Sequence, residues 1–273
     1  MKYTLRIFGI MLLAFVISCK TNPFTGKKTL ALVSNDQLFP TSFQQYNTVL
    51  SESKVITGTA ESEMIKRVGQ RIAVASERWL NANGYQGYLT DYKWEYSLID
   101  SDQVNAWCMP GGKIAFYTGI MPIAANETGV AAIMGHEVAH ALANHGQQRM
   151  STGMLQQLGA AGVAIGTGGS ESQDAWMQAY GVGSTLGMLS YSRKHETEAD
   201  KIGLYLMAVA GYNPDEAANL WERMKANSGG QAPPEFMSTH PHPDTRIKEL
   251  QALAPEAKKE AAKFGVTSFK PVN

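Results

Sequence analysis

Two histidines one helical turn apart lie inside a strongly apolar segment, and this feature constrains the fold more than any other. His136, Glu137 and His140 form the pattern His-Glu-x-x-His. On a helix both imidazoles face one side and can share a metal ion, while Glu137, rotated by about 100°, can reach a water bound to that metal. The surrounding apolar residues are Val130, Ala131, Ile133, Val138 and Ala139. Burying two imidazoles and a carboxylate there without a metal would be costly, so the pattern predicts a buried helix that carries zinc.

The third protein ligand distinguishes between classes of zinc site. Two histidines, one carboxylate and an open position for water make up a catalytic zinc site. A metzincin would have Gly and His where this chain has Ala143 and Gly146, which excludes that class. His145 follows His136 by nine residues and so falls on the opposite helix face. We expect His145 to cap the helix or to face solvent.

A gluzincin takes its third ligand, a glutamate, from a later helix, and three glutamates are candidates. Glu171 lies in a Gly- and Ser-rich stretch without helical support. Glu196 precedes an apolar helical pattern, and Asp200 lies one turn further on, where it can orient a ligand histidine. Glu198 is two residues from Glu196 and points elsewhere, so we expect it to be a solvated charge. The spacing therefore favours Glu196 as the third metal ligand and Asp200 as the residue that orients a ligand histidine.

The N-terminus has the pattern of a bacterial lipoprotein signal. Lys2 and Arg6 precede an apolar run over 7–17 that is too short to span a bilayer. The run leads to a small residue followed by Cys19, which resembles a lipobox. We predict that residues 1–18 are a signal peptide and that Cys19 is lipidated.

This signal sets the expected domain organisation and location. We expect residues 19–40 to be a tether and residues 41–273 to be a single zinc metallopeptidase domain. Lys20 stands where an Asp would retain a lipoprotein at the inner membrane, so we expect a periplasm-facing lipoprotein of the outer membrane in a bacterial cell envelope. Cys108 is the only other cysteine, which excludes a disulfide framework.

Composition narrows the class of protein further. The chain has 273 residues, 24 Lys plus Arg and 24 Asp plus Glu, and is 44% hydrophobic. This neutral balance argues against nucleic-acid binding through a basic surface. The apolar fraction is too high for a disordered chain, so a globular domain is expected.

Periodicity predicts an α+β fold that is mostly α, with a small sheet near the metal-binding helix. Apolar residues recur at helical spacing over 60–82, and the pattern is again helical from Glu127 onward. Alternating residues predict strands over 92–99 and 114–117. Further expectations are a turn at 110–112, a helix starting at Asn213-Pro214, a linker over 228–234 and a helix from Asp244 to about Leu253. The Met- and Gly-rich region 151–190 could be packed helices or a lid over the site.

Three motifs in order resemble peptidase family M48. The zinc pattern is joined by Glu196-x-x-x-Asp200, by Asn105-Ala106-x-x-x-Pro110-Gly111-Gly112 and by Thr239-His240-Pro241-x-Pro243-x-x-Arg246. The resemblance covers roughly residues 60–250 and is nearest to the soluble periplasmic members of the BepA and LoiP type, with no C-terminal repeat domain expected in this chain. It implies a gluzincin (zincin-like) metallopeptidase with one Zn²⁺ per chain.

The resemblance also implies roles for particular residues. Glu137 would be the general base of peptide hydrolysis. Arg246 matches the family motif as a donor to the oxyanion, with His195 and His242 as alternatives. The strand containing Ile114, Ala115 and Phe116 resembles the edge strand that binds an extended substrate, although a purely structural strand fits equally well. His240 aligns with a residue that can occupy the fourth zinc position and hold the enzyme latent.

The function implied is a lipid-anchored zinc endopeptidase that hydrolyses misfolded or unassembled envelope proteins. The alternative is an envelope chaperone or assembly factor with a latent zinc site. The first function requires Glu137, whereas the second does not.

Overall fold

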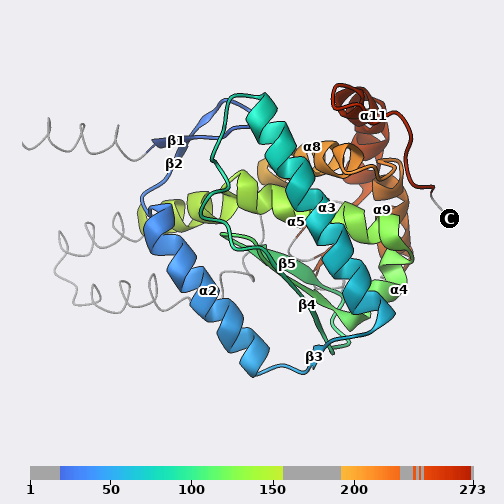
Figure 1. Cartoon of the computed structure of the whole chain (residues 1–273), viewed down its shortest axis with the longest axis horizontal. Coiled ribbons are helices and arrows are strands. Elements are labelled where there is room, and N and C mark those ends of the chain that lie inside the picture. Colours follow the sequence, from blue (N-terminus) through green and yellow to red (C-terminus); the bar gives the residue numbers. More distant parts are fainter. Residues whose placement is uncertain (1–18, 156–191, 228–235, 238–239, 241–242, 272–273) are drawn as a thin grey trace, which may run out of the picture.

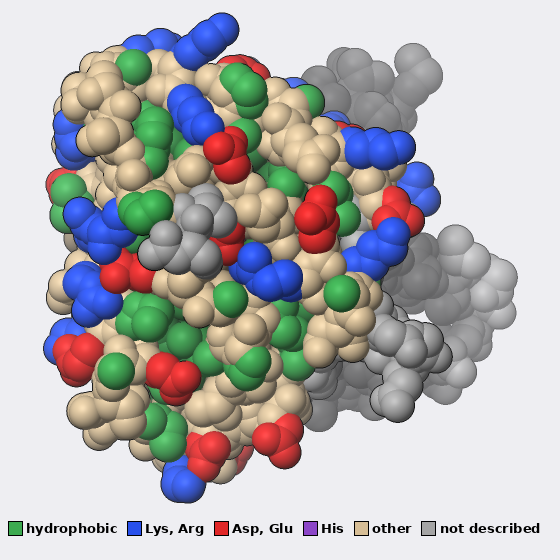
Figure 2. Space-filling model, turned by 90° about the vertical axis from the view of Figure 1, so that its right-hand side faces the viewer, with side chains coloured by type: hydrophobic (Ala, Val, Ile, Leu, Met, Phe, Trp, Pro, Cys, Tyr) green, Lys and Arg blue, Asp and Glu red, His purple; other side chains and the backbone are tan. Residues whose placement is uncertain are grey.

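A computed structural model describes residues 19–155, 192–227, 236–237, 240 and 243–271. Helices predominate and a small sheet lies among them (Figure 1), which confirms the predicted α+β, mostly α class. Within the described residues, no helix is both long and apolar enough to cross a membrane. Positive and negative side chains are intermingled on the face shown in Figure 2.

All the strands of the described residues lie before residue 118, alongside two long helices, and the described residues after them are mostly helical. The strands are β1 (Cys19–Thr21), β2 (Lys28–Leu30), β3 (Val55–Ile56), β4 (Glu95–Ile99), β5 (Ala106–Met109) and β6 (Lys113–Tyr117). The α-helices are α2 (Asn35–Ser51), α3 (Ala60–Ala82), α4 (Met121–Ala124), α5 (Glu127–Leu142), α8 (Arg193–Val209), α9 (Glu216–Asn227) and α11 (Pro243–Ala262), and a 3-10 helix η1 covers Thr118–Ile120.

The main sheet has the strand order β3-β4-β6-β5. β4 and β6 are parallel, whereas β3 and β5 run antiparallel to their neighbours. β6 is therefore an interior strand, and its residues Ile114, Ala115 and Phe116 are fully buried. Our expectation that these three residues form the edge strand is wrong, because β6 pairs with β4 on one side and with β5 on the other. A substrate strand therefore has no free side of β6 to pair with. The edge strands of this sheet are β3 and β5, and β5 is the one next to β6.

Helix α3 forms where the apolar periodicity predicts it, over residues 60–82. Its inner stripe includes Val68 and Ile72, both fully buried. Thr59 caps the helix by accepting a hydrogen bond from the Ser62 backbone amide. A Cβ atom at Gly69 would lie 2.1 Å from the Tyr96 ring, so the missing side chain lets α3 approach β4 closely.

The chain between residues 19 and 40 is more ordered than the tether we expected. β1 and β2 form an antiparallel hairpin, and α2 already begins at Asn35. Ser34 and Gln37 form a capping box at the start of α2, a local signal that favours a helix at this point. Residues 1–18, which include the predicted signal peptide, lie outside the described residues.

Three other element boundaries differ from expectation. The predicted strand 92–99 begins only at Glu95. α9 begins at Glu216, although the Asn213 side chain accepts from the Asp215 amide as a capping residue would. α11 begins at Pro243 and continues to Ala262, well beyond Leu253. Its later turns bury alanines, which carry a weaker apolar signal than leucine does. The buried residues of this stripe are Leu250, Ala254, Ala257 and Ala261.

Candidate metal centre

Helix α5 carries the first two candidate metal ligands. Asn126 caps it by accepting from the Gly129 amide at 2.9 Å, and every residue from Thr128 to Leu142 is buried. His136 and His140 therefore project from a helix that has no solvent-exposed face. Their Nε2 atoms lie 3.0 Å apart, as the spacing of one turn predicts.

Helix α8 brings the third candidate ligand to the same point. Glu196 lies in its first turn and is 2% exposed. Its Oε1 is 3.4 Å from His140 Nε2 and its Oε2 is 3.4 Å from His136 Nε2. The two helices can approach this closely because Gly135 and Gly203 meet at their crossing, where a Cβ on either residue would come within 2.8 Å of backbone atoms.

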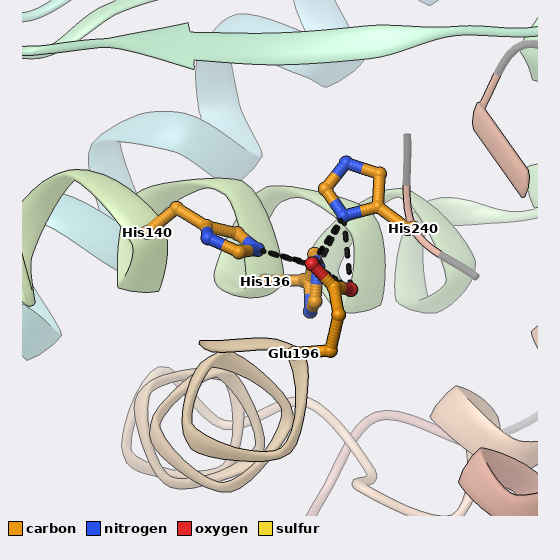
Figure 3. A group of neighbouring side chains, drawn as sticks. All are labelled: His136, His140, Glu196 and His240. Atoms are coloured by element: carbon orange, nitrogen blue, oxygen red, sulfur yellow. Dashed lines mark hydrogen bonds and ion pairs between the residues drawn. The ribbon is translucent and has the colours of Figure 1, made fainter. Parts of the chain in front are cut away.

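A fourth donor comes from far along the chain. His240 Nδ1 lies 3.1 Å from His136 Nε2 and 3.0 Å from Glu196 Oε2. In Figure 3, His136 and His140 project from α5, Glu196 reaches up from the helix below, and His240 approaches from the opposite side. One ligand atom from each of these four buried residues lies within 4.8 Å of the others. Imidazole nitrogen and carboxylate oxygen are the donors that zinc prefers, so the set fits a zinc ion.

Glu137 lies next to this cluster, and one of its carboxylate oxygens accepts no hydrogen bond from the described residues. Its side chain is buried, and its Oε1 has no hydrogen-bond partner among the described residues. His240 Nε2 is 3.4 Å from that oxygen. Burial raises the pKa of the Glu137 carboxyl, although the nearby His240 and His136 oppose the shift. A buried acceptor without a partner is rare in proteins and fits a group that handles a water beside a metal.

Asp200 and Arg246 contact the candidate ligands His136 and Glu196 and hold them in place. Asp200 Oδ1 is 3.0 Å from His136 Nδ1, the contact predicted for a residue that orients a ligand. Arg246 donates from Nε to Asp200 Oδ2 at 2.8 Å and from Nη1 to Glu196 Oε2 at 2.8 Å. Its guanidinium also stacks on Trp221, 3.9 Å from the ring centre. These contacts commit the guanidinium to two carboxylates rather than to the oxyanion position that we expected.

The carboxylates of Glu196 and Asp200 are negatively charged, as the binding of a metal cation requires. Burial alone raises the pKa of Glu196, but the facing imidazoles of His240, His136 and His140 outweigh it, so the pKa lies below its ordinary value. Burial likewise raises the pKa of Asp200, and Arg246 reverses the shift. Both carboxylates are therefore charged at neutral pH.

His145 and Glu198 differ most from expectation. His145 is fully buried, with Nδ1 3.0 Å from His140 Nδ1. Its Nε2 is 3.4 Å from Glu198 Oε1, and the Glu198 side chain is only 12% exposed. The expectation from helical spacing is wrong because α5 ends at Leu142 and Asn144 adopts a φ of 57°, which turns the chain back. Asn is a common left-handed helix terminator, so Asn144 was the signal that could have revealed the turn.

A pocket adjoins the cluster on the side of the sheet. Glu137, His140 and His240 line it, together with residues 105–110 around β5. The Tyr117 amide donates to the Asn105 carbonyl across the β5–β6 ladder. Hydrogen-bonded and non-hydrogen-bonded pairs alternate in an antiparallel ladder, so the backbone groups of Ala106 and Cys108 point away from β6.

The remaining candidate residues lie elsewhere. His195 stacks on His145 with ring centres 4.4 Å apart and is not among the four clustered donors. Cys19 is exposed at the start of β1. His242, Glu171, the linker over 228–234 and most of the region 151–190 lie outside the described residues.

This chain is similar to a known protein family and to several known proteins. The family model described as peptidase family M48 matches residues 59–254. The mitochondrial metalloendopeptidase OMA1 of Schizosaccharomyces pombe is 37% identical over 175 residues, which cover 62% of this chain and 49% of that protein. The mitochondrial metalloendopeptidase OMA1 of Homo sapiens is 27% identical over 270 residues, covering 93% and 50%. The β-barrel assembly-enhancing protease of Escherichia coli (strain K12) is 27% identical over 167 residues, covering 58% and 34%. The chain thus spans at most about half the length of these relatives.

Proposed function

Because this chain belongs to peptidase family M48, we propose that it is a zinc-dependent endopeptidase that hydrolyses misfolded or unassembled proteins of a bacterial cell envelope. The observation that carries this proposal is the buried cluster of His136, His140, Glu196 and His240 beside Glu137, whose Oε1 accepts no hydrogen bond from the described residues. A structural zinc site has no reason to keep such an acceptor next to a pocket.

The residues of the cluster divide the chemistry between them. His136, His140 and Glu196 would hold one zinc ion per chain, which when bound acts as a Lewis acid and makes a water molecule more acidic. The raised pKa of Glu137 suits a general base, because a base closer to neutral pH can both accept the proton of the attacking water and return it to the leaving amine. Asp200 and Arg246 are positioning residues, since their contacts hold His136 and Glu196 in place.

The edge strand β5 is the proposed substrate-binding strand. The Ala106 amide already donates to Asn105 Oδ1 at 2.9 Å. An extended peptide that pairs with the outward Ala106 carbonyl and with the backbone groups of Cys108 would lie in the pocket lined by Glu137. Main-chain pairing of this kind gives affinity with modest sequence specificity, which suits unfolded substrates.

His240 is the proposed brake on activity. It is close enough to the other three ligands to occupy a fourth position, and its backbone amide donates to the Phe236 carbonyl at 2.9 Å. Phe236 in turn donates its amide to the Val104 carbonyl, so the brake is connected to the chain just before β5. A substrate that binds along β5 could release His240, and His240→Ala should therefore raise proteolysis.

The proposed location in a bacterial cell envelope is supported by the N-terminal pattern and by the bacterial relatives. We assign Cys19 as the lipidation site because it follows an apolar signal-like run and is exposed. The β-barrel assembly-enhancing proteases of Yersinia pestis and Escherichia coli are named for a process that concerns envelope proteins, which supports substrates of that class. Labelling with an alkyne fatty acid should be lost in Cys19→Ser.

Cleavage of unfolded casein by the full-length protein in detergent tests the activity. Wild type should bind about one zinc and cleave, whereas Glu137→Gln should bind the same zinc and lose at least about 100-fold in rate. Equal cleavage by both proteins would refute the role of Glu137. Zinc binding without cleavage by wild type or by His240→Ala would favour the chaperone instead.

A further inference from the structure

A chain of buried polar contacts continues beyond the ligand His140, away from the metal. His140 Nδ1 lies 3.0 Å from His145 Nδ1, and His145 Nε2 lies 3.4 Å from Glu198 Oε1. Asn22 is fully buried and donates its side-chain amide to the same Glu198 oxygen. These residues come from the end of α5 and the chain just after it, from α8 and from the N-terminal hairpin, so three separate parts of the chain meet at this point.

The direction of each hydrogen bond follows from the role of His140. If Nε2 of His140 faces the metal, that nitrogen offers its lone pair and the proton of the ring resides on Nδ1. The Nδ1–H group then donates to His145 Nδ1, which must be the unprotonated nitrogen of that ring. His145 consequently carries its proton on Nε2 and donates it to the Glu198 carboxylate. One arrangement of protons satisfies all of these contacts.

The orientation of Asn22 is determined independently. Its Oδ1 accepts from the Phe24 backbone amide at 2.9 Å, so its NH₂ group must face Glu198. The hairpin itself is held by the Phe24 ring, which stacks on Trp79 with centres 4.4 Å apart, and by the Asn22 backbone amide, which donates to the Lys27 carbonyl. The hairpin thus presents a donor of defined direction to the carboxylate.

We propose that His145 and Glu198 are positioning residues that hold the His140 imidazole with Nε2 towards the metal, and that Asn22 of the hairpin holds Glu198 in place. The proposal rests on the zinc site of the proposed function and extends it to the N-terminal hairpin. A ligand histidine usually donates its second ring nitrogen to a carboxylate or a carbonyl; in this site a second imidazole stands between the ligand and the carboxylate.

Packing alone does not account for these residues. A fully buried imidazole, a largely buried carboxylate and a buried amide all require desolvation, and apolar residues of similar size would fill the same space without it. The hairpin is consequently part of the metal site, close in sequence to the proposed anchor at Cys19.

Zinc affinity of the full-length protein, measured by competition with a fluorescent chelator, tests the proposal without recourse to activity. Glu198→Ala should weaken zinc binding by about 10- to 100-fold, and Glu198→Gln, which keeps an acceptor oxygen, should recover most of that loss. Asn22→Leu should weaken it by roughly 3- to 10-fold. The double variant Asn22→Leu/Glu198→Ala should match Glu198→Ala alone, because Asn22 acts through Glu198.

A matched control separates positioning from a general loss of charge. Glu256→Ala removes an exposed carboxylate that pairs with Lys201 and should leave zinc affinity unchanged. Unchanged affinity in both Glu198→Ala and Asn22→Leu, while wild type binds zinc, would overturn this inference alone. Additive losses in the double variant would overturn the part assigned to Asn22. Failure of wild type to bind zinc would overturn the proposed function and this inference with it.

Discussion

Replacing Gly203 by Ala tests whether the close approach of α5 and α8 assembles the metal site. Helix propensity alone predicts that Gly→Ala stabilises the protein by up to about 1 kcal/mol. The structure predicts the opposite sign, because the new Cβ would lie 2.8 Å from the His136 amide nitrogen and 2.9 Å from the Gly135 carbonyl carbon. Ordinary contacts begin at 3.4 Å, so the helices must move apart by about half an ångström.

This displacement affects both stability and metal binding. Overpacking a buried contact costs about 1–3 kcal/mol, which leaves a net destabilisation of about 0–2 kcal/mol after the gain in propensity. Metal–ligand distances tolerate only about 0.2 Å of change, so we expect at least about 10-fold weaker zinc binding, since His136 and Glu196 lie on the two separating helices. The melting temperature of the metal-free protein should fall by up to about 8 °C.

Gly153→Ala is the matched control for this experiment. Gly153 lies in the helical stretch 145–155, and a Cβ there would meet nothing within 4 Å. The control should raise the melting temperature by a few degrees, about 2–4 °C per kcal/mol, and leave zinc affinity unchanged. If Gly203→Ala also raises the melting temperature and binds zinc as wild type does, the close approach of the helices does not assemble the site.

Three further predictions concern charge and metal. Burial raises the pKa of Glu127, but hydrogen bonds from Arg67 and Lys270 outweigh this effect and lower the pKa to about 2. The ionised carboxylate therefore stabilises the folded protein fully above pH 4.5, the ordinary pKa, and this contribution disappears as the pH falls towards 2. After allowance for solvent screening, Glu127→Gln should lower the free energy of unfolding by about 1 kcal/mol at pH 7 and by almost nothing near pH 2, as measured by urea unfolding; a constant difference would contradict this. Arg246→Met should cost about 3–5 kcal/mol because two buried carboxylates lose their counter-charge, and an unchanged melting temperature would refute that role. Zinc in 100-fold excess over its dissociation constant should stabilise the protein by about 2.7 kcal/mol, an increase that chelation should reverse; equal melting temperatures with and without zinc would argue against the metal centre.

Sequence periodicity is sufficient for features that depend on one element. The spacing of His136 and His140 predicts two imidazoles on one face of α5, and their Nε2 atoms are indeed 3.0 Å apart. The predicted family is confirmed, and so is the extent of α3. In a helix, side chains three or four residues apart lie on the same face, so a short stretch of sequence is enough to predict which side chains lie together.

Periodicity fails where the geometry depends on how the chain leaves an element. Counting residues along an ideal helix assigns His145 to the far side of α5, but the left-handed Asn144 ends that helix and returns His145 to His140. Glu198 is expected in solvent because its partners, His145 and Asn22, come from parts of the chain that no helical spacing relates to it.

Residue type and short spacing were enough to predict His136, His140 and Glu196 as candidate metal ligands and to indicate the family, whereas His240 was expected only from the resemblance to that family. The identity of β5 as an edge strand could not be found in this way, since strand order is a property of the whole sheet. The same holds for the contacts of Arg246 with Asp200 and Glu196, and for the hairpin that reaches the metal site. Such contacts join residues more than 40 positions apart, and they form only when separate elements pack together, as α5 and α8 also do where Gly135 meets Gly203.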